Sequence, residues 1–250
     1  YSLQPKGVVV QVDAAAQRLG ATYPALGVLG DARDVLAALA AGVPRAPRPW
    51  GEEAVTALRH RVAAGLASQG RELETGILAA VADAVPDDAV QAWDMTILGY
   101  WAAAHQRAPE PRRFLYPLGS GTLGYAFPAS LGAAVALPGV PVLAVVGDGG
   151  FAYGMAELAT ARQYGLRTTL LVVDSGGYGI LREYQMAAYG VEHEVDLVQP
   201  DYEGIARASG VAARLSGADR LSEDLIWAMA QSGTAVVVLR ERLVAAEPTP

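Results

Sequence analysis

Residues 142–179 read VLAVVGDGGFAYGMAELATARQYGLRTTLLVVDSGGYG, and this stretch decides the fold. It holds two short apolar runs, Val142–Val146 and Thr168–Val173, and each run ends in a glycine-rich turn. Apolar runs of this length, separated by the helical spacing of Met155–Tyr164, are typical of strands buried inside a parallel sheet. The alternation extends in both directions, with strands expected at Ala89–Trp93 and Ala235–Leu239 and helices at Glu52–Ser68, Leu73–Ala84, Leu98–Gln106, Phe127–Leu137 and Leu221–Ser232. The sequence therefore predicts an α/β fold, a parallel sheet with helices on both faces.

A proline-rich stretch divides the chain. Residues 42–51 read GVPRAPRPWG, contain three prolines and lack a hydrophobic period, which is typical of a linker. Before this stretch the pattern predicts two strands and then a helix with Asp31 as its N-cap. We therefore predict a short N-terminal unit at residues 1–41, a linker, and a main domain at residues 52–250.

The composition argues against several classes of protein. The chain has 19 Lys and Arg against 26 Asp and Glu, and a net charge of −7 disfavours binding to nucleic acid or to an anionic membrane. It has no cysteine, which excludes disulfides and thiolate chemistry and is compatible with the cytoplasm, the location that we expect. The longest uncharged stretch, residues 114–147, is interrupted by prolines, so no transmembrane helix is predicted. The chain starts at Tyr1 and not at Met, which predicts a processed start or a piece of a longer protein.

Two glycine patterns, Gly119–Gly124 and Gly147–Ala152, fit the dinucleotide-binding fingerprint. Asp148 weakens an NAD-binding interpretation, because its carboxylate would stand where a pyrophosphate approaches. A bridging metal ion would remove this conflict, and Mg²⁺ prefers oxygen ligands that it shares with phosphates. Asp174 and Ser175 end the next strand, at the same edge of the sheet, and are candidates for further oxygen ligands.

The arrangement resembles the cofactor motif of thiamine-diphosphate (ThDP) enzymes, in which GDG is followed one strand later by a pair of asparagines. Here Gly147-Asp148-Gly149 is followed by Ser175, 27 residues after Asp148. GSGTLGYAFPASLGAA (119–134) and FAYGMAELATARQYGL (151–166) resemble the flanking segments of the acetolactate synthase-like branch. Residues 8–41, with the pattern VLGDARDVLAAL, resemble the tail of that branch's Rossmann-like middle domain. The resemblance implies that the chain is the C-terminal, diphosphate-binding half of such an enzyme.

The resemblance also implies a cofactor site. Asp148, the Ser175 hydroxyl and the Gly177 carbonyl would ligate Mg²⁺, which would hold the diphosphate of ThDP. Ser175 departs from the family, which usually has Asn or Asp at this position, and its side chain is shorter. The candidate cofactor-binding residues are Met95, Thr96, Ile97, Gly121, Thr122, Leu123, Gly147, Asp148, Gly149, Gly150, Ser175, Gly177, Tyr178 and Gly179.

Four residues are the catalytic candidates that the resemblance implies. The Gly121 carbonyl would accept a hydrogen bond from the aminopyrimidine, and Leu123 would support the bent cofactor. Ile180 and Leu181 stand where simple decarboxylases of this superfamily place a proton-donating acid. Apolar residues there favour ligation of the product to a second carbonyl over release of an aldehyde. The implied reaction is therefore decarboxylation of a 2-oxo acid with carboligation, with a simple 2-oxo acid decarboxylase as the alternative.

The family activates the cofactor with a Glu on a separate pyrimidine-binding domain, and no segment here resembles that domain. We therefore expect such a domain on another chain or in a missing N-terminal segment, within a homo- or hetero-oligomer (dimer or tetramer). A non-catalytic ThDP-fold subunit stays open as an alternative, and an NAD-binding Rossmann protein is the least favoured interpretation. Asp13 is a candidate contact for FAD, which some relatives keep. Two locations stay open for Tyr178, Arg182 and Tyr184. We expect them either to border a substrate entrance or to lie on a solvated helix face.

Overall fold

The computed structural model describes residues 6–44, 50–108 and 110–247. The chain divides into two compact units, Tyr1–Arg59 and His60–Pro250. The boundary falls within helix α2 (Trp50–Ala67), which begins inside the stretch predicted as a linker. Gly42 also belongs to a helix, and residues 45–49 of that stretch lie outside the described residues.

The first unit contains a two-stranded parallel sheet. Strands β1 (Val10–Asp13) and β2 (Leu26–Leu29) pair along their length, with a short 3-10 turn, η1 (Ala16–Arg18), between them. Helix α1 (Ala32–Gly42) follows, and the Asp31 carboxylate accepts a hydrogen bond from the Arg33 amide at 2.8 Å, which confirms the predicted N-cap. A two-stranded sheet is marginally stable by itself. The assignment of this unit to a middle domain stays a prediction.

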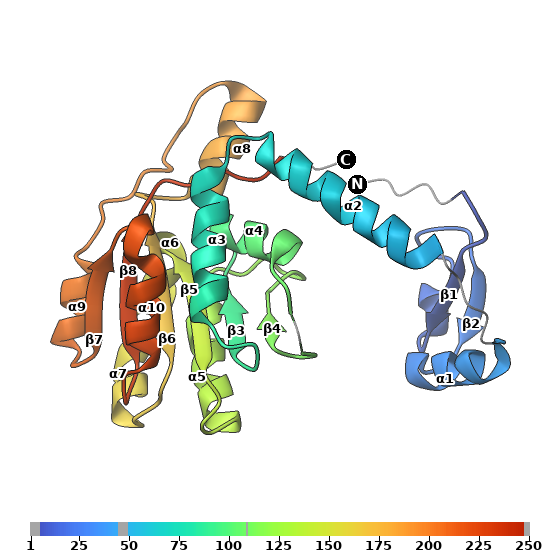
Figure 1. Ribbon diagram of the computed structural model, residues 1–250, viewed down its shortest axis with the longest axis horizontal. Helices are drawn as coiled ribbons and strands as arrows, with labels where there is room; N and C mark the ends of the chain where they lie inside the picture. The colour runs from blue at the N-terminus through green and yellow to red at the C-terminus, as the bar shows by residue number, and fades with distance from the viewer. Residues whose placement is uncertain (1–5, 45–49, 109, 248–250) are drawn as a thin grey trace. The chain divides into compact units, whose positions relative to one another are not determined.

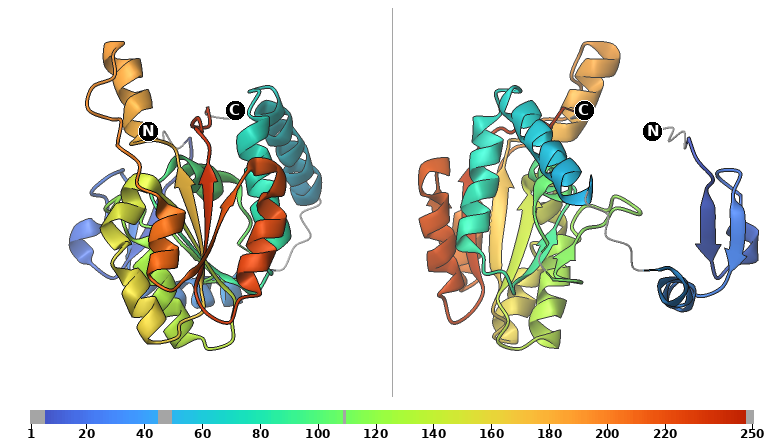
Figure 2. Two further views of the ribbon diagram at one scale, coloured as in Figure 1. Left: turned by 90° about the vertical axis from the view of Figure 1, so that its left-hand side faces the viewer. Right: turned by 45° about the vertical axis from the view of Figure 1, so that its right-hand side comes forward.

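The second unit is built on a six-stranded sheet in the order β4-β3-β5-β6-β8-β7, and every neighbouring pair is parallel. The arrows in Figure 2 accordingly point the same way. In chain order the strands are β3 (Val90–Trp93), β4 (Phe114–Leu115), β5 (Val142–Gly147), β6 (Thr169–Asp174), β7 (Ala212–Ser216) and β8 (Ala235–Arg240).

Helices cover both faces of this sheet (Figure 1). Leu143 and Val145 of β5 pack in one core with α3 (Glu72–Ala84), α4 (Ile97–His105) and α10 (Leu221–Met229), which follows the 3-10 turn η2 (Ala218–Arg220). Ala144 and Val146 pack in a second core on the opposite face, with α5 (Ala126–Ala136), α6 (Asp148–Gly154), α7 (Glu157–Gln163) and α9 (Tyr202–Ala208). Because side chains alternate along a strand, an unbroken apolar run supplies both cores. The predicted fold class is confirmed.

Some elements differ from the prediction. The sequence pattern did not predict β4, β7, α9 or α8 (Gly179–Tyr189), and α6 begins directly at Asp148, where only a glycine turn was expected. β4 and β7 are the edge strands, and they carry less of the apolar pattern because neighbours cover them less completely. Among the helices of the described residues, none is long and apolar enough to cross a bilayer.

The strand order reverses between β3 and β5. From β3 the chain crosses to β4 at one edge, then returns past β3 to β5 and continues toward the other edge. Consequently α4 and α5, which follow β3 and β4, lie on opposite faces of the sheet. Such a reversal opens a crevice at the carboxyl ends of the two strands, which is where ligands of open α/β sheets bind.

Candidate functional site

A cavity of about 240 Å³ lies at this reversal, beyond the carboxyl ends of β3, β5 and β6. Fifteen of the sixteen candidate site residues line it, and Thr122 is exposed and does not. The candidates at the cavity are Met95, Thr96, Ile97, Gly121, Leu123, Gly147, Asp148, Gly149, Gly150, Ser175, Gly177, Tyr178, Gly179, Ile180 and Leu181. Segments far apart in the sequence thus meet in one place.

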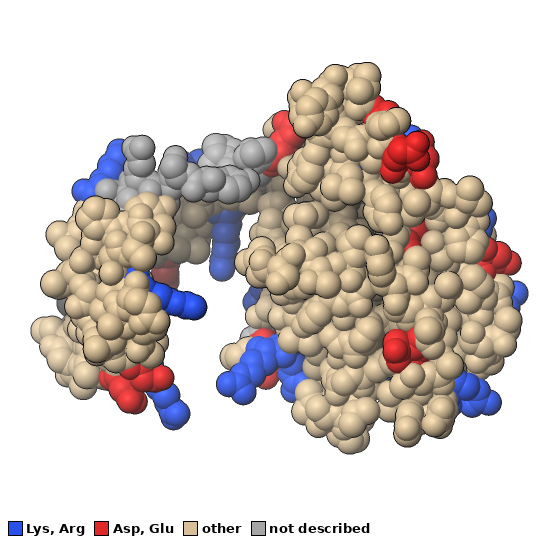
Figure 3. Space-filling model, turned by 180° about the vertical axis from the view of Figure 1, so that it is seen from behind, with Lys and Arg blue, Asp and Glu red and all other residues tan. Residues whose placement is uncertain are grey.

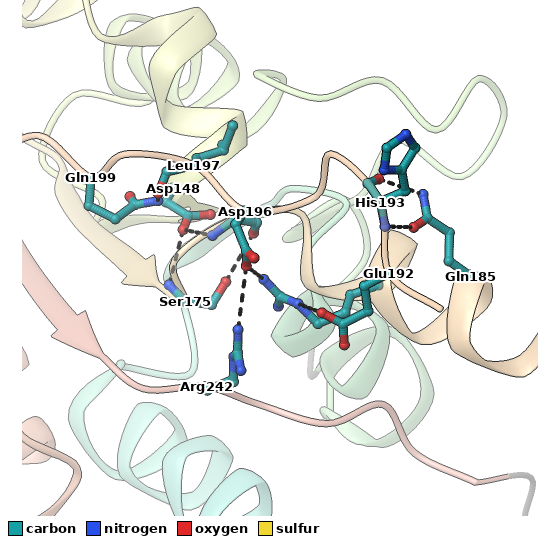
Figure 4. Close-up of polar contacts among 11 residues, drawn as sticks. Asp148, Ser175, Gln185, Glu192, His193, Asp196, Leu197, Gln199 and Arg242 are labelled. Atoms are coloured by element: carbon teal, nitrogen blue, oxygen red, sulfur yellow. Dashed lines mark hydrogen bonds and ion pairs between the residues drawn. The ribbon is translucent and has the colours of Figure 1, made fainter. Parts of the chain in front are cut away.

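Asp148 is a buried carboxylate of this cavity, with 2% of its surface exposed. One oxygen accepts from the Gly149 amide at 2.8 Å, and the other accepts from the amides of Ser175 and Gly177 at 3.1 and 2.8 Å. Figure 4 shows this carboxylate turned toward the loop that carries Ser175. Burial raises the pKa of Asp148 above its ordinary value despite these hydrogen bonds. The Tyr202 hydroxyl donates a hydrogen bond to the Asp148 backbone carbonyl at 3.3 Å.

The other two candidate metal ligands lie on the loop between β6 and α8. The Ser175 hydroxyl donates to the Gly177 carbonyl, and the two oxygens are 3.2 Å apart. Gly177 has a φ of +146°, and a Cβ at this position would stand 2.1 Å from the Val195 carbonyl oxygen. Glycine is therefore required at position 177, because any side chain would displace the loop.

The donor set fits a hard divalent cation. It offers a carboxylate, a hydroxyl and a carbonyl, and oxygens about 3 Å apart suit an octahedral ion with ligands at about 2.1 Å. In the described ranges Asp148 makes no ion pair with Lys or Arg. Within the same ranges no three His, Asp or Glu side chains cluster as a metal site. A cation here would offset the cost of burying one charge.

Asp94 is a site residue that the sequence analysis missed. It is fully buried after β3, and its carboxylate accepts from the amides of Gly124, Met95 and Tyr125 at 2.9, 3.1 and 3.3 Å. It thereby ties the segment that carries Gly121 and Leu123 to the end of β3. Burial raises the pKa of Asp94 above its ordinary value. The sequence signal that could have identified Asp94 is its position at a strand end. β3, β5 and β6 each end in an Asp or just before one.

Replacing Asp94 with alanine is expected to lower the free energy of unfolding by about 2–4 kcal/mol, because three partly buried amides lose their acceptor. Asp201→Ala is the matched control. Its carboxylate also accepts from a backbone amide, that of Gly204, but at an exposed helix cap, where the expected cost is about 1 kcal/mol. Denaturant unfolding measures both variants, and equal losses would contradict the role given to Asp94.

The cavity also has apolar and aromatic residues in its lining. Leu123, Ile180 and Leu181 line it, together with the rings of Tyr100 and Tyr184. Leu181 and Tyr184 on α8 are about half exposed, and the end of α8 is mostly uncharged at the top of the view in Figure 3. Among the described residues, Asp94 and Asp148 are the only acids at this cavity.

Other candidates lie elsewhere. Asp174 forms an ion pair with Arg240 at 3.2 Å and does not line the cavity. Tyr178 and Tyr184 do line it, whereas Arg182 is buried and turned to two carboxylates beyond the site. Asp13 accepts from the Ala15 amide at 2.8 Å in the first unit. A contact of Asp13 with FAD stays a prediction.

Comparison with known proteins decides the family. Residues 94–239 match "Thiamine pyrophosphate enzyme, C-terminal TPP binding domain". The chain belongs to the thiamine pyrophosphate enzyme family. Thiamine pyrophosphate is the same compound as ThDP, so the resemblance inferred from the GDG motif is confirmed. In this chain the region that matches the family begins at Asp94, and it includes every candidate site residue.

Individual thiamine pyrophosphate enzymes resemble the chain to different extents. It is 36% identical over 241 residues to the probable 2-ketoarginine decarboxylase of Pseudomonas aeruginosa, covering 94% of this chain and 43% of that protein. It is 37% identical over 128 residues to the probable acetolactate synthase large subunit of Methanocaldococcus jannaschii, covering 50% of this chain and 22% of that protein. The chain thus spans less than half the length of these relatives.

A solved thiamine pyrophosphate enzyme shares the fold. The thiamine diphosphate-dependent 4-hydroxybenzoylformate decarboxylase of Rhodococcus jostii RHA1 superposes with a TM-score of 0.74 at 19% identity. The match covers 96% of this chain and 45% of that one. At this identity the likeness supports the fold alone.

Proposed function

We propose that the chain supplies the diphosphate-binding half of a ThDP- and Mg²⁺-dependent enzyme that decarboxylates a 2-oxo acid. The observation that carries this proposal is the buried Asp148, whose carboxylate meets a loop with the Ser175 and Gly177 oxygens 3.2 Å apart. When bound, ThDP supplies the electron sink that allows CO₂ to leave a 2-oxo acid. The residues of this chain bind and orient it.

The diphosphate is proposed to bind to the protein through a cation. Asp148, the Ser175 hydroxyl and the Gly177 carbonyl would hold Mg²⁺ against the diphosphate oxygens. Gly149 and Gly150 are buried and closely packed, since a Cβ on either would collide with the Tyr178 ring or the Asp94 carboxylate. Packing therefore requires glycine at both positions, and the backbone groups of these glycines are proposed to lie near the diphosphate.

The apolar side chains that line the cavity are proposed to face the reacting part of the substrate. Leu123, Ile180 and Leu181 present hydrocarbon there, which excludes water and favours loss of a charged carboxylate. The Gly121 carbonyl would accept a hydrogen bond from the aminopyrimidine. Gly121 has a φ of +62°, held over the Met95 methyl group, and glycine adopts this conformation without strain.

Two observations bear on the fate of the product. Ile180 and Leu181 are apolar at positions where simple decarboxylases of this superfamily place a proton-donating acid, which favours carboligation to a second carbonyl. The relative that aligns over 94% of the chain is named as a decarboxylase, which favours release of an aldehyde. We keep carboligation as proposed from the residues and simple decarboxylation as the second candidate.

The whole enzyme requires more than this chain. Support comes from the relatives, which are more than twice as long, and from apolar side chains exposed on α8, of which Leu181 and Tyr184 line the cavity. A pyrimidine-binding domain, on another chain or on an N-terminal segment, would cover this surface and supply the activating Glu. The proposed assembly is a homo- or hetero-oligomer.

The test is an assay of the complete protein with pyruvate and with 2-ketoarginine. We expect CO₂ release that requires both ThDP and Mg²⁺. Adding an aldehyde or a second 2-oxo acid distinguishes the two fates, because carboligation consumes the acceptor and simple decarboxylation leaves it unchanged. Binding of ThDP without turnover of any 2-oxo acid would instead indicate a non-catalytic subunit, and binding of NADH without ThDP would overturn the proposal.

A further inference from the structure

The loop that carries the candidate metal ligands, residues 175–178, lies between two parts of the chain. On one side Asp148 accepts from its amides, as described above. On the other side lies an extended segment after α8, residues 191–197, here named the strap. The Tyr178 amide donates to the Val195 carbonyl at 2.9 Å, and the Leu197 amide donates to the Gly176 carbonyl at 3.1 Å. Gly177 and Asp196 form an antiparallel bridge between these bonds.

The loop and the strap are in close backbone contact at Gly177. A Cβ at Gly177 would stand 2.1 Å from the Val195 carbonyl oxygen, so the two backbones are in direct contact. The loop that carries the Gly177 carbonyl and the Ser175 hydroxyl is therefore in contact with the strap on one side and with Asp148 on the other. We therefore expect a movement of the strap to displace the candidate ligands.

The strap itself has little support from apolar packing. Its residues are largely exposed, apart from Val195, which is 3% exposed. Glu194 has a φ of +53°, a left-handed conformation that costs a non-glycine residue free energy. A segment with few buried contacts and local strain opens readily unless polar interactions hold it.

Arg182 on α8 supplies such polar interactions, as two ion pairs with residues of the strap. Arg182 is only 7% exposed, and its guanidinium forms ion pairs with Asp196 at 2.5 Å and with Glu192 at 3.2 Å. Arg182 also stands one turn after the loop, with its amide bonded to the Tyr178 carbonyl at 3.0 Å. One buried cation thus ties both ends of the strap to the helix that begins at the metal loop.

Two further contacts support the same segment, and Figure 4 shows them around Asp196 and His193. Gln185 of α8 exchanges two hydrogen bonds with the backbone of His193, at 2.6 and 3.1 Å. Arg242 reaches Asp196 at 3.6 Å, but its side chain is 64% exposed. Because solvent screens exposed ion pairs, Arg242 contributes much less than the buried Arg182.

We propose that Arg182 is a positioning residue for the cation site. It holds Glu192 and Asp196, these hold the strap, and the strap sets the Gly177 carbonyl and the Ser175 hydroxyl. The identity of the cation as Mg²⁺ rests on the proposed function. Arg182 does not line the cavity, so it is expected to set the Mg²⁺ concentration that the protein requires and not the rate of the chemical step.

The test compares Arg182→Gln with Arg242→Gln, which removes a cation from the same Asp196 at an exposed position. In the metal-free complete protein, amide hydrogen exchange at Tyr178 and Leu197 is expected to accelerate at least about tenfold in Arg182→Gln and to stay unchanged in Arg242→Gln. In ThDP titrations by calorimetry, the Mg²⁺ concentration for half-saturation is expected to rise about 10–100-fold in Arg182→Gln alone. Saturating Mg²⁺ should then restore kcat.

Asp196→Asn provides a second route, because this exposed residue can change without burying an unpaired charge. It should raise exchange at Leu197 and the Mg²⁺ requirement in the same direction, and Arg182→Lys should fall between wild type and Arg182→Gln. A lower unfolding midpoint with unchanged exchange and Mg²⁺ requirement would overturn the proposal, as would a kcat that saturating Mg²⁺ does not restore. If the wild type bound no ThDP with Mg²⁺, the proposed function would fail, whereas the exchange comparison would still decide whether Arg182 orders the loop.

Discussion

Replacing Asp148 with alanine is expected to abolish Mg²⁺-dependent binding of ThDP to the complete protein, weakening it by at least about a hundredfold. The substitution removes the one carboxylate among the candidate ligands. It also removes the acceptor that holds the amides of Ser175 and Gly177, so the loop with the other two ligands loses its anchor. Isothermal calorimetry with ThDP, with and without Mg²⁺, measures the loss.

Two further variants separate the charge of Asp148 from its structural role. Asp148→Asn keeps an acceptor oxygen but not the charge, so we expect a folded protein that needs far more Mg²⁺. Asp174→Asn changes another buried carboxylate at a strand end, one that pairs with Arg240 outside the cavity, and should leave the Mg²⁺ requirement within about threefold. Binding of ThDP to Asp148→Ala with wild-type affinity would refute the cation site.

The second large effect is expected from Gly177→Ala. Its Cβ would stand 2.1 Å from the Val195 carbonyl oxygen at a φ of +146°, so the strap or the loop must move. We expect a loss of about 2–4 kcal/mol in the free energy of unfolding. Because the Gly177 carbonyl is a candidate ligand, the Mg²⁺ requirement should rise at the same time.

The neighbouring glycine provides a matched control for this substitution. Gly176 also has a left-handed backbone, with a φ of +79°, but the space around its missing Cβ is open. Gly176→Ala should therefore cost only the backbone strain, about 1 kcal/mol, and change the Mg²⁺ requirement little. Denaturant unfolding and Mg²⁺ titration of both variants test the difference, and equal behaviour would show that the contact with Val195 does not fix the loop.

The sheet and most of its helices were predictable from the sequence because their signal is local. Runs such as Val142–Val146 are apolar at every position, which a strand requires when helices cover both of its faces. The edge strand β4 was not predictable, because two residues with partial cover carry no period. Helix α8 projects apolar side chains into solvent beside the cavity, so its pattern did not distinguish a helix from a loop.

The candidate site was predictable to the extent that its residues follow strand ends. Asp148 and Ser175 each follow a recognisable strand, and parallel strands bring their carboxyl ends to one edge. Asp94 follows a strand in the same way, but its role depends on amides 30 and 31 residues further along the chain. Arg182 looked like an entrance or surface residue, because only the fold shows which carboxylates surround it.

The sequence by itself determined the family, the parallel sheet and the strand ends at which chemistry is placed, because these depend on residue type and spacing along the chain. Only the tertiary structure decided that Asp94 ties the Gly121 segment to β3 and that Asp174 belongs to an ion pair away from the cavity. It alone showed that Arg182 holds the strap against the metal loop. The reason is physical: a buried charge is stabilised by whichever groups folding brings within about 3 Å, and sequence spacing does not encode that distance.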